Sequence, residues 1–443
     1  MKLAILGSGP LALETALHFD KLGAHVTLFS RGELGGMAAR VNSFASETSM
    51  EESWGELTTE LGREALELNV DLSDIPSNDE YFKNYFLPLV ARGSQSVIIK
   101  PGNVERVHKR FLSLEEEVPG KSRLQDLFRV VFSTDPKKSI LNQVESNPEL
   151  FEKLGDDVLD SLSESVEAFE DFDLIINAMG TYSKPSPMGP SGSHALNEAR
   201  LTPKTNTYYG RECLSHYNEV TSHSKHIVMV GSGHLSALLL CELDLWLEED
   251  EKRVVSLVTT EDRPFENFLK NHKESTLGLM ITEVINKYFE KLQISRREYE
   301  KSLFEWRGLE PHIKAKKAAP KEPTSQLNLI TASNVTALDK LLDREGLFVT
   351  CETSSFRSST EGMEEQISTV SCDGIFVCTG HEADTKTAKG LRVNFEKRGE
   401  GISHSEPGYF TLNGIESGKS SLSSGLKKIS KIETEIMNFF SRA

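Results

Sequence analysis

Short apolar runs alternate with amphipathic helical segments along this chain, and one succession occurs twice. Residues 2–6 and 25–29 predict two parallel strands, joined by a helix over 10–22 that ends at Gly23. The second succession consists of a strand near 226–230, a helix over 235–247 and a strand over 254–258. Each succession predicts a βαβ unit, so we expect an α/β fold with two of these units.

Further apolar runs predict the remaining elements. Residues 173–180 and 373–380 each predict a short buried strand that ends in a glycine turn. The other expected elements are helices over 79–92 and 424–440, and strands over 327–332, 346–352 and 366–370. The aromatic side chains of the 79–92 helix are expected in the core rather than around a substrate.

Size and charge narrow the class of protein. The 443 residues suffice for two or three domains. The formal net charge of −17 disfavours nonspecific binding to nucleic acid or an anionic membrane, so we expect neither as a partner. The acidic stretch 139–170 is predicted as a helix-prone, solvated insertion. The Lys/Pro-rich run 314–323 is predicted as an exposed loop rather than a nucleic-acid patch.

The cysteine pattern indicates a reducing compartment. The five cysteines are an odd number and include no CxxC pair, which gives neither a zinc site nor a redox dithiol. No other metal-ligand or catalytic-triad spacing stands out, so no metal and no catalytic side chain is assigned. With no signal-peptide pattern and no apolar run long enough to span a bilayer, we expect a cytoplasmic protein.

The strongest chemical signal is a glycine fingerprint between the first strand and the helix of each βαβ unit. The first glycine permits a tight turn, the second lets the backbone approach a pyrophosphate, and a small third residue lets helix and strand pack closely. Amide groups at the helix N-terminus then hold the anion. The fingerprints consist of Gly7, Ser8, Gly9, Pro10, Leu11 and Ala12, and of Gly231, Ser232, Gly233, His234 and Ser236.

This order of motifs resembles the flavoprotein oxidoreductases with two dinucleotide-binding domains, which include flavin-containing monooxygenases and pyridine-nucleotide reductases. The likeness is greatest to a poorly characterised bacterial branch. It covers most of the chain, apart from the acidic insertion and residues 273–325. The segments that carry it are 75–89, 180–189, 231–237, 379–381 and 405–410.

The resemblance implies two Rossmann-like domains, with the NAD(P) domain inserted into the FAD domain. Its expected boundaries are 1–205 and 386–443 for FAD and 206–385 for NAD(P). The first fingerprint would surround the FAD pyrophosphate and the second that of NADPH or NADH. Further implied contacts are Gly35, Gly36 and Met37 beside the flavin, Val104 at the adenine, Gly180 and Thr181 where the domains join, Gly380 after the second glycine-turn strand, and Gly418 as a flavin cap.

The ends of the second strands depart from the family pattern. FAD-type units usually carry Glu or Asp there to bind the ribose, but this chain has Ser30 and Arg31. Ser30 can supply one weaker bond to FAD, or Ser30 and Arg31 can form a pocket for the 2′-phosphate of NADP. In the second unit Thr259 ends the strand, and Arg263 follows closely enough to face a phosphate, which favours NADPH over NADH.

The functional hypothesis is an FAD-dependent oxidoreductase that NAD(P)H reduces and that passes electrons to an unidentified small substrate or to oxygen. The FxGxxxH signature of monooxygenases is not met, because Leu214 stands at the histidine position and His216 comes two residues later. An N-hydroxylating monooxygenase is a weaker option. The alternative from another class is a non-catalytic nucleotide-binding sensor or partner-binding protein with the flavoprotein fold. A homo-oligomer is compatible with either function.

Overall fold

The chain folds into two compact units. The computed structural model describes residues 1–31, 34, 52–114, 123–134, 166–179, 184–340, 346–356, 363–381, 386–393, 406–412 and 422–442. Unit 1 comprises Met1–Lys184 and Glu382–Ala443, and unit 2 comprises Pro185–His381, so unit 2 is inserted between two parts of unit 1. None of the helices in these stretches is long and apolar enough to cross a membrane.

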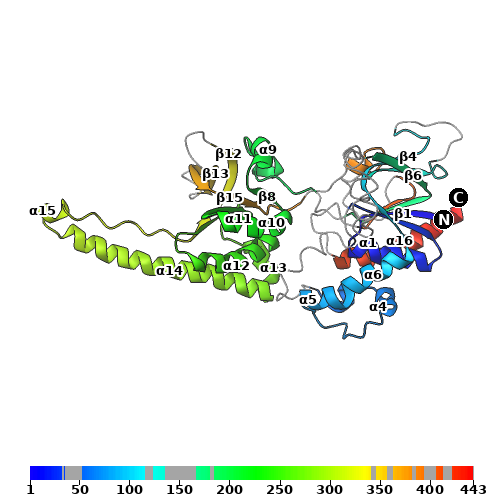
Figure 1. The fold of residues 1–443 in the computed structure, drawn as a ribbon, viewed down its shortest axis with the longest axis horizontal. Helices are drawn as coiled ribbons and strands as arrows, with labels where there is room; N and C mark the ends of the chain where they lie inside the picture. Colours follow the sequence, from blue (N-terminus) through cyan, green and yellow to red (C-terminus); the bar gives the residue numbers. More distant parts are fainter. Residues whose placement is uncertain are drawn as a thin grey trace, which may run out of the picture. The chain divides into compact units, whose positions relative to one another are not determined.

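A five-stranded parallel sheet in the order β16-β7-β1-β2-β3 forms the centre of unit 1 (Figure 1). Its strands are β1 (Lys2–Leu6), β2 (His25–Ser30), β3 (Ile98–Pro101), β7 (Leu174–Asn177) and β16 (Tyr409–Thr411). Four of the five residues of the central strand β1 are buried. A central strand of a parallel sheet is buried on both faces, so its residues form an unbroken apolar run.

Helices and a small antiparallel sheet complete unit 1. Helix α1 follows β1 and contacts both α6 and α16. The helices are α1 (Pro10–Lys21), α3 (Trp54–Leu57), α4 (Glu60–Ala65), α5 (Asn78–Tyr81), the π-helix η1 (Phe82–Phe86), α6 (Leu87–Ser96), the 3₁₀ turn η5 (Lys386–Ala388) and α16 (Leu422–Arg442). The antiparallel strands are β4 (Asn103–Lys109), β5 (Phe128–Thr134) and β6 (Val166–Phe172).

Unit 2 is also built on a five-stranded parallel sheet, in the order β11-β10-β9-β15-β8. Its strands are β8 (Thr207–Tyr209), β9 (His226–Val230), β10 (Val254–Val258), β11 (Leu327–Ile330) and β15 (Gly374–Val377). A separate antiparallel sheet contains β12 (Ser333–Asp339), β13 (Leu347–Phe356) and β14 (Met363–Cys372).

The longest helix of unit 2 is α14 (Thr276–Arg307), which extends well beyond the sheet to α15 at its far end (Figure 1). The other helices are η3 (Pro190–Gly192), α9 (Glu198–Leu201), η4 (Thr202–Lys204), α10 (Glu212–Ser215), α11 (Tyr217–His223), α12 (His234–Glu249), α13 (Glu266–His272) and α15 (Pro311–Lys314).

The two units repeat one topology. In each, the strand that precedes the fingerprint is central, with the next strand of the βαβ unit on one side and the glycine-turn strand on the other. A three-stranded antiparallel sheet precedes the glycine-turn strand in the chain, as β4–β6 in unit 1 and β12–β14 in unit 2. The edge strand beside it differs in origin, since unit 1 uses β16 from its last segment and unit 2 uses β8 from its first.

Most expected elements are confirmed, and one expectation is wrong. Residues 166–170 belong to strand β6 rather than to a helical insertion, because they pair with β5. Most β6 side chains are exposed, so the strand lacks the apolar alternation that would have revealed it. Strands β3, β5, β8 and β12 were also not among the expected elements. The 79–92 helix is present as α5, η1 and α6, and Tyr81, Tyr85 and Phe86 lie in the core as expected.

Candidate functional site

The turn between β1 and α1 requires glycine at position 7. Gly7 has a φ of +117°, in the region that side chains disfavour. A Cβ atom there would lie 2.7 Å from the carbonyl oxygen of Ala178, just after β7. The N–H of Gly7 donates to the carbonyl oxygen of Phe29 at 3.0 Å, which ties the turn to β2. Gly7 is therefore required by the fold itself.

Gly9 has no such structural reason to be glycine. Its φ of −75° and ψ of 178° suit any residue, and a Cβ there would meet no atom of the described residues within 4 Å. It is the N-cap of α1, which begins with Pro10 and has no side-chain cap. The first N–H groups of a helix lack intrahelical acceptors and favour an anion. The missing side chain of Gly9 thus leaves open space in front of an uncapped helix, which fits a bound pyrophosphate.

The second fingerprint repeats this division of roles. Gly231 has a φ of +106°, and a Cβ there would lie 2.5 Å from the carbonyl oxygen of Cys378, just after β15. Gly233 has a φ of −92°, and no atom in the described part of the chain lies within 4 Å of its Cβ position. It is the N-cap of α12, which likewise has no side-chain cap. Each unit therefore contains one glycine that the fold requires and one that leaves space for a ligand.

The end of β2 lies beside the first fingerprint, as the register of β1 and β2 requires. Ser30 is buried there, and its carbonyl oxygen accepts from the N–H of Gly102 at 2.8 Å. This bond places the start of β4, with the buried residue Val104, next to Ser30. Arg31 is exposed. Hydrogen bonds from Ser133 and Asn103 lower the pKa of nearby Glu105, and the charge of Arg31 contributes.

The corresponding strand end in unit 2, after β10, is followed by an acidic residue, Glu261. Thr259 is buried at the end of β10, and its Oγ1 lies 2.7 Å from Oγ of Ser232 in the fingerprint. Glu261 accepts from the N–H groups of Glu266 and Asn267, at 2.9 and 3.3 Å, and so caps α13. Its carboxylate is thus used within the fold, whereas Arg263 is exposed.

Three further predicted positions surround the second fingerprint. His234 is exposed at the start of α12, with its ring edge-on to Phe268 at 5.8 Å between centroids. Ser236 is fully buried, as the small third position requires. Gly380 has a φ of +99° and open space at its Cβ position, and its carbonyl oxygen accepts from the N–H of Ser186 at 3.0 Å.

Six predicted contacts lie outside the described residues, so the structure does not test them. They are Gly35, Gly36, Met37, Gly180, Thr181 and Gly418. The predicted residues that are described form two groups, one at each fingerprint. The remaining positions of the first group, Ser8, Pro10, Leu11 and Ala12, form the turn and the first residues of α1.

A buried carboxyl group on the fingerprint helix was not expected. Glu14 is buried in α1, where its Oε2 accepts from Oγ1 of Thr59 at 2.6 Å and its Oε1 accepts from the hydroxyl of Tyr85. Tyr85 belongs to the π-helix η1, so this pair connects α1 to the helix 71 residues later. Burial raises the pKa of Glu14 above its usual value of 4.5, despite these hydrogen bonds.

The raised pKa of Glu14 predicts a pH-dependent stability. Because the folded chain holds this proton more tightly than the unfolded chain, the stabilisation is complete below pH 4.5 and is lost as the pH rises through the folded pKa. As the pH rises above 4.5 we expect the unfolding free energy of the wild type to fall relative to that of Glu14→Gln. Thermal unfolding of both chains measures this. The exposed control Glu60→Gln should show no such trend, and parallel curves for Glu14→Gln and wild type would contradict the assignment.

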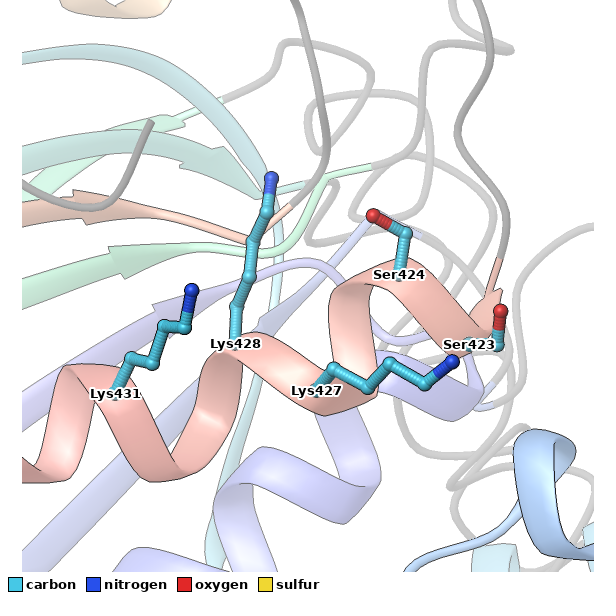
Figure 2. A pocket seen from close by; sticks show the side chains of 5 residues that line it. All are labelled: Ser423, Ser424, Lys427, Lys428 and Lys431. Carbon is cyan, nitrogen blue, oxygen red and sulfur yellow. The ribbon is translucent and has the colours of Figure 1, made fainter. Parts of the chain in front are cut away.

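A basic pocket lies on α16, which packs against the fingerprint helix through Gly425 and Leu11. It is lined by Ser423, Ser424, Lys427, Lys428 and Lys431. In Figure 2, Ser424, Lys428 and Lys431 rise from one side of the helix, and Lys427 extends toward Ser423. Lys427 lies 3.6 Å from Glu56, and Ser423 donates to Glu52 at 2.6 Å. This pocket was not predicted, although the sequence places Lys427, Lys428 and Lys431 within two turns of the last amphipathic helix.

All five cysteines belong to unit 2. Cys213, Cys351, Cys372 and Cys378 are buried, and all five cysteines are free. Burial raises the pKa of Cys351 to about 11 and that of Cys372 to about 12. A reactive cysteine needs an accessible thiolate, which these environments disfavour. Among the described residues, no group of three or more His, Cys, Asp or Glu side chains is arranged to hold a metal ion.

Comparison with solved structures identifies the fold. The bacillithiol disulfide reductase Bdr (YpdA) from Bacillus cereus aligns over 100% of both chains, with a TM-score of 0.57 and 12% identity. DfoA from Erwinia amylovora, a cadaverine monooxygenase bound to FAD, aligns over 98% of this chain and 94% of its own, with a TM-score of 0.57 and 11% identity. This chain has the same two-domain α/β fold as these flavoproteins.

A third structure with this fold carries both kinds of nucleotide. The ornithine N-hydroxylase KtzI from Kutzneria sp. 744, described with reduced FAD, NADP⁺ and L-ornithine, aligns over 99% of this chain and 98% of its own, with a TM-score of 0.55 and 12% identity. No protein-family model and no curated protein sequence matches the chain. The shared fold therefore includes both reductases and monooxygenases.

Proposed function

We propose that this chain is an FAD-dependent oxidoreductase reduced by NADPH or NADH. The observation that carries the proposal is the pair of open glycine positions, Gly9 and Gly233, each at the N-terminus of an uncapped helix. Neither position needs glycine for its backbone angles or for packing. Both leave room for a pyrophosphate, and the shared fold supports two dinucleotides in one chain.

The residues fit FAD in unit 1 and the nicotinamide nucleotide in unit 2. In unit 1, residues 7–12 would hold the pyrophosphate, and Ser30, Arg31 and the backbone at Val104 would flank the adenosine half. In unit 2, residues 231–236 would hold the pyrophosphate, with Thr259 and Arg263 at the ribose. When bound, these groups supply hydride transfer from nicotinamide to flavin and electron transfer to an acceptor, while the protein contributes binding and orientation.

The acceptor is proposed to be a small molecule or oxygen rather than a dithiol of this chain. The sequence contains no CxxC pair, and burial raises the pKa of Cys213, Cys241, Cys351 and Cys372. A second candidate is an N-hydroxylating monooxygenase that acts on an amine, supported by the likeness to DfoA and KtzI. Substrate-stimulated NADPH consumption that yields a hydroxylamine would distinguish this activity from a direct reductase.

The absorbance spectrum of the purified chain is the primary test. We expect a flavin spectrum, FAD in the supernatant after denaturation, and NAD(P)H oxidation that depends on the bound flavin. A colourless chain that FAD does not reconstitute would contradict the proposal. Binding of NADP alone at the first fingerprint would instead support the non-catalytic alternative, because Ser30 and Arg31 would then serve a 2′-phosphate.

The position of Arg263 predicts a preference for NADPH. If its guanidinium faces the 2′-phosphate, Arg263→Ser should raise the KM for NADPH about tenfold, consistent with the loss of one charged hydrogen bond. The KM for NADH should change little, because NADH lacks that phosphate. Steady-state kinetics with both nucleotides measures the effect, and Lys270→Ser, at an exposed lysine on α13, is the control. Equal changes for the two nucleotides would exclude this role.

A further inference from the structure

Helix α14 consists of a packed half and an unpacked half. Its buried residues are Leu277, Gly278, Ile281, Val284 and Tyr288, all in the first half. The helix then continues to Arg307, about 29 Å further at 1.5 Å per residue, with no buried residue among positions that are all described. We call residues 289–323, which include α15 and the start of the returning segment, the arm (Figure 1).

Three large apolar side chains of the arm are more than half exposed to solvent. Phe289 and Ile294 are each 57% exposed, and Phe304 is 80% exposed. The returning segment contacts the helix at Trp306, whose indole N–H donates to the carbonyl oxygen of Lys317 at 2.8 Å. Most helices in proteins are stabilised by packing an apolar face, so this helix is suited to a partner that covers these side chains.

Opposite charges lie at the two ends of the arm. Its tip, residues 311–321, contains Lys314, Lys316, Lys317 and Lys321 and no acidic residue. At its base, residues 248–251 at the end of α12 read Glu-Glu-Asp-Glu. Two of these carboxylates are paired within the copy, Glu248 with Lys287 of α14 at 2.6 Å and Glu249 with Arg253 at 2.5 Å. Asp250 and Glu251 extend the acidic end beyond these pairs.

These opposite charges cannot meet within one copy, because a helical span of about 29 Å separates them. Two copies remove that restriction. When two arms lie antiparallel, each basic tip reaches the acidic end of α12 in the other copy, and the exposed Phe289 and Phe304 lie between the two ends. Such a contact is isologous, so the same residues pair twice about a two-fold axis. The net charge of −17 would otherwise make the copies repel.

We propose that the arm is a dimerisation element whose partner is the arm and α12 end of a second copy of this chain. The interface is narrow, since it consists of one helix and its tip from each copy. Narrow interfaces are typical of weak association, so we expect micromolar dissociation constants that increase with salt. The proposal does not depend on bound flavin or nicotinamide nucleotide, and its test has no activity readout.

Sedimentation equilibrium of the full chain, from 1 to 200 μM and at low and high salt, tests the dimer. Lys316→Glu/Lys317→Glu/Lys321→Glu should weaken it at least tenfold, and so should Glu249→Lys/Glu251→Lys at the acidic end. The chain that carries all five changes should recover most of the affinity, because both contacts become complementary again. Phe289→Ser/Phe304→Ser should weaken the dimer at both salt concentrations.

Three results would overturn the proposal. The first is a wild-type monomer at every concentration, and the second is a dimer that the charge reversals leave unchanged. The third is failure of the five-change chain to recover association although circular dichroism shows it folded. If the monomer instead sediments with phosphatidylserine vesicles, and the lysine variant does not, the tip binds an anionic lipid surface and the dimer is excluded.

Discussion

Gly9→Ala is expected to release FAD without unfolding the chain. The backbone angles of Gly9 suit alanine and its Cβ position is open, so the substitution should cost at most about 1 kcal/mol as a change of N-cap residue. A methyl group at that position would occupy the space in front of α1, and we expect FAD affinity to fall at least 100-fold. Flavin absorbance per chain after gel filtration, together with the unfolding temperature, measures both effects.

The matched control is Gly7→Ala in the same turn. Alanine at a φ of +117°, with its Cβ 2.7 Å from a backbone oxygen, should destabilise unit 1 by about 2–4 kcal/mol whether or not FAD is present. Comparing the two variants therefore separates an effect on FAD affinity from an effect on folding stability. Gly233→Ala and Gly231→Ala allow the same comparison for the nicotinamide nucleotide in unit 2. Full retention of FAD by Gly9→Ala would show that the pyrophosphate does not lie at this turn.

Arg123→Met is expected to cause the largest loss of stability in unit 1. The guanidinium donates to both carboxylate oxygens of Glu406, at 2.9 and 2.5 Å, and the Glu406 side chain is 0% exposed. Removing one partner of a buried ion pair costs up to about 3–5 kcal/mol. The charge of the buried Lys109 also acts on Glu406 and offsets part of this cost. Calorimetry should show the unfolding transition of unit 1 roughly 10 °C lower.

The exposed pair Arg106–Glu167 provides the control for this prediction. Its side chains are both more than half exposed and 3.4 Å apart, so Arg106→Met should change stability by less than about 1 kcal/mol. Glu406 lies in the segment that precedes β16, and its Oε2 also accepts from the N–H of Arg392 at 2.8 Å. Equal effects from the two substitutions would mean that Glu406 is not held as a buried charge.

The fingerprints could be predicted because their physics is local. A strand, a positive-φ glycine and a helix start follow one another within a few residues, so Gly7 and Gly231 are visible in the sequence alone. The different role of Gly9 was also inferable, but only the structure shows that its backbone angles suit any residue. Local patterns thus predicted strands β7, β1 and β2 of unit 1, strands β11, β10, β9 and β15 of unit 2, and both candidate cofactor turns.

The features that were missed depend on contacts between distant residues. Glu14 bonds a tyrosine 71 positions later, and nothing near either residue marks the pair. Glu198 is similarly buried, accepting from the N–H groups of Met188 and Ala195 and from the hydroxyl of Tyr209, so it organises an irregular segment that has no periodicity. Strand β6 was missed because its side chains are mostly exposed.

The different origins of the edge strands determine the order in which the units can be completed during synthesis. All strands of unit 2 have been translated by the time the ribosome passes His381. Unit 1 still lacks β16 and α16, whose Ile429, Ile432 and Ile436 belong to the core around α1. Because domains generally fold as units, the inserted unit can fold first. Until α16 is synthesised, the apolar face of the N-terminal segment that it covers stays exposed. We therefore expect the first-made half of the nascent chain to be the part that most needs chaperones.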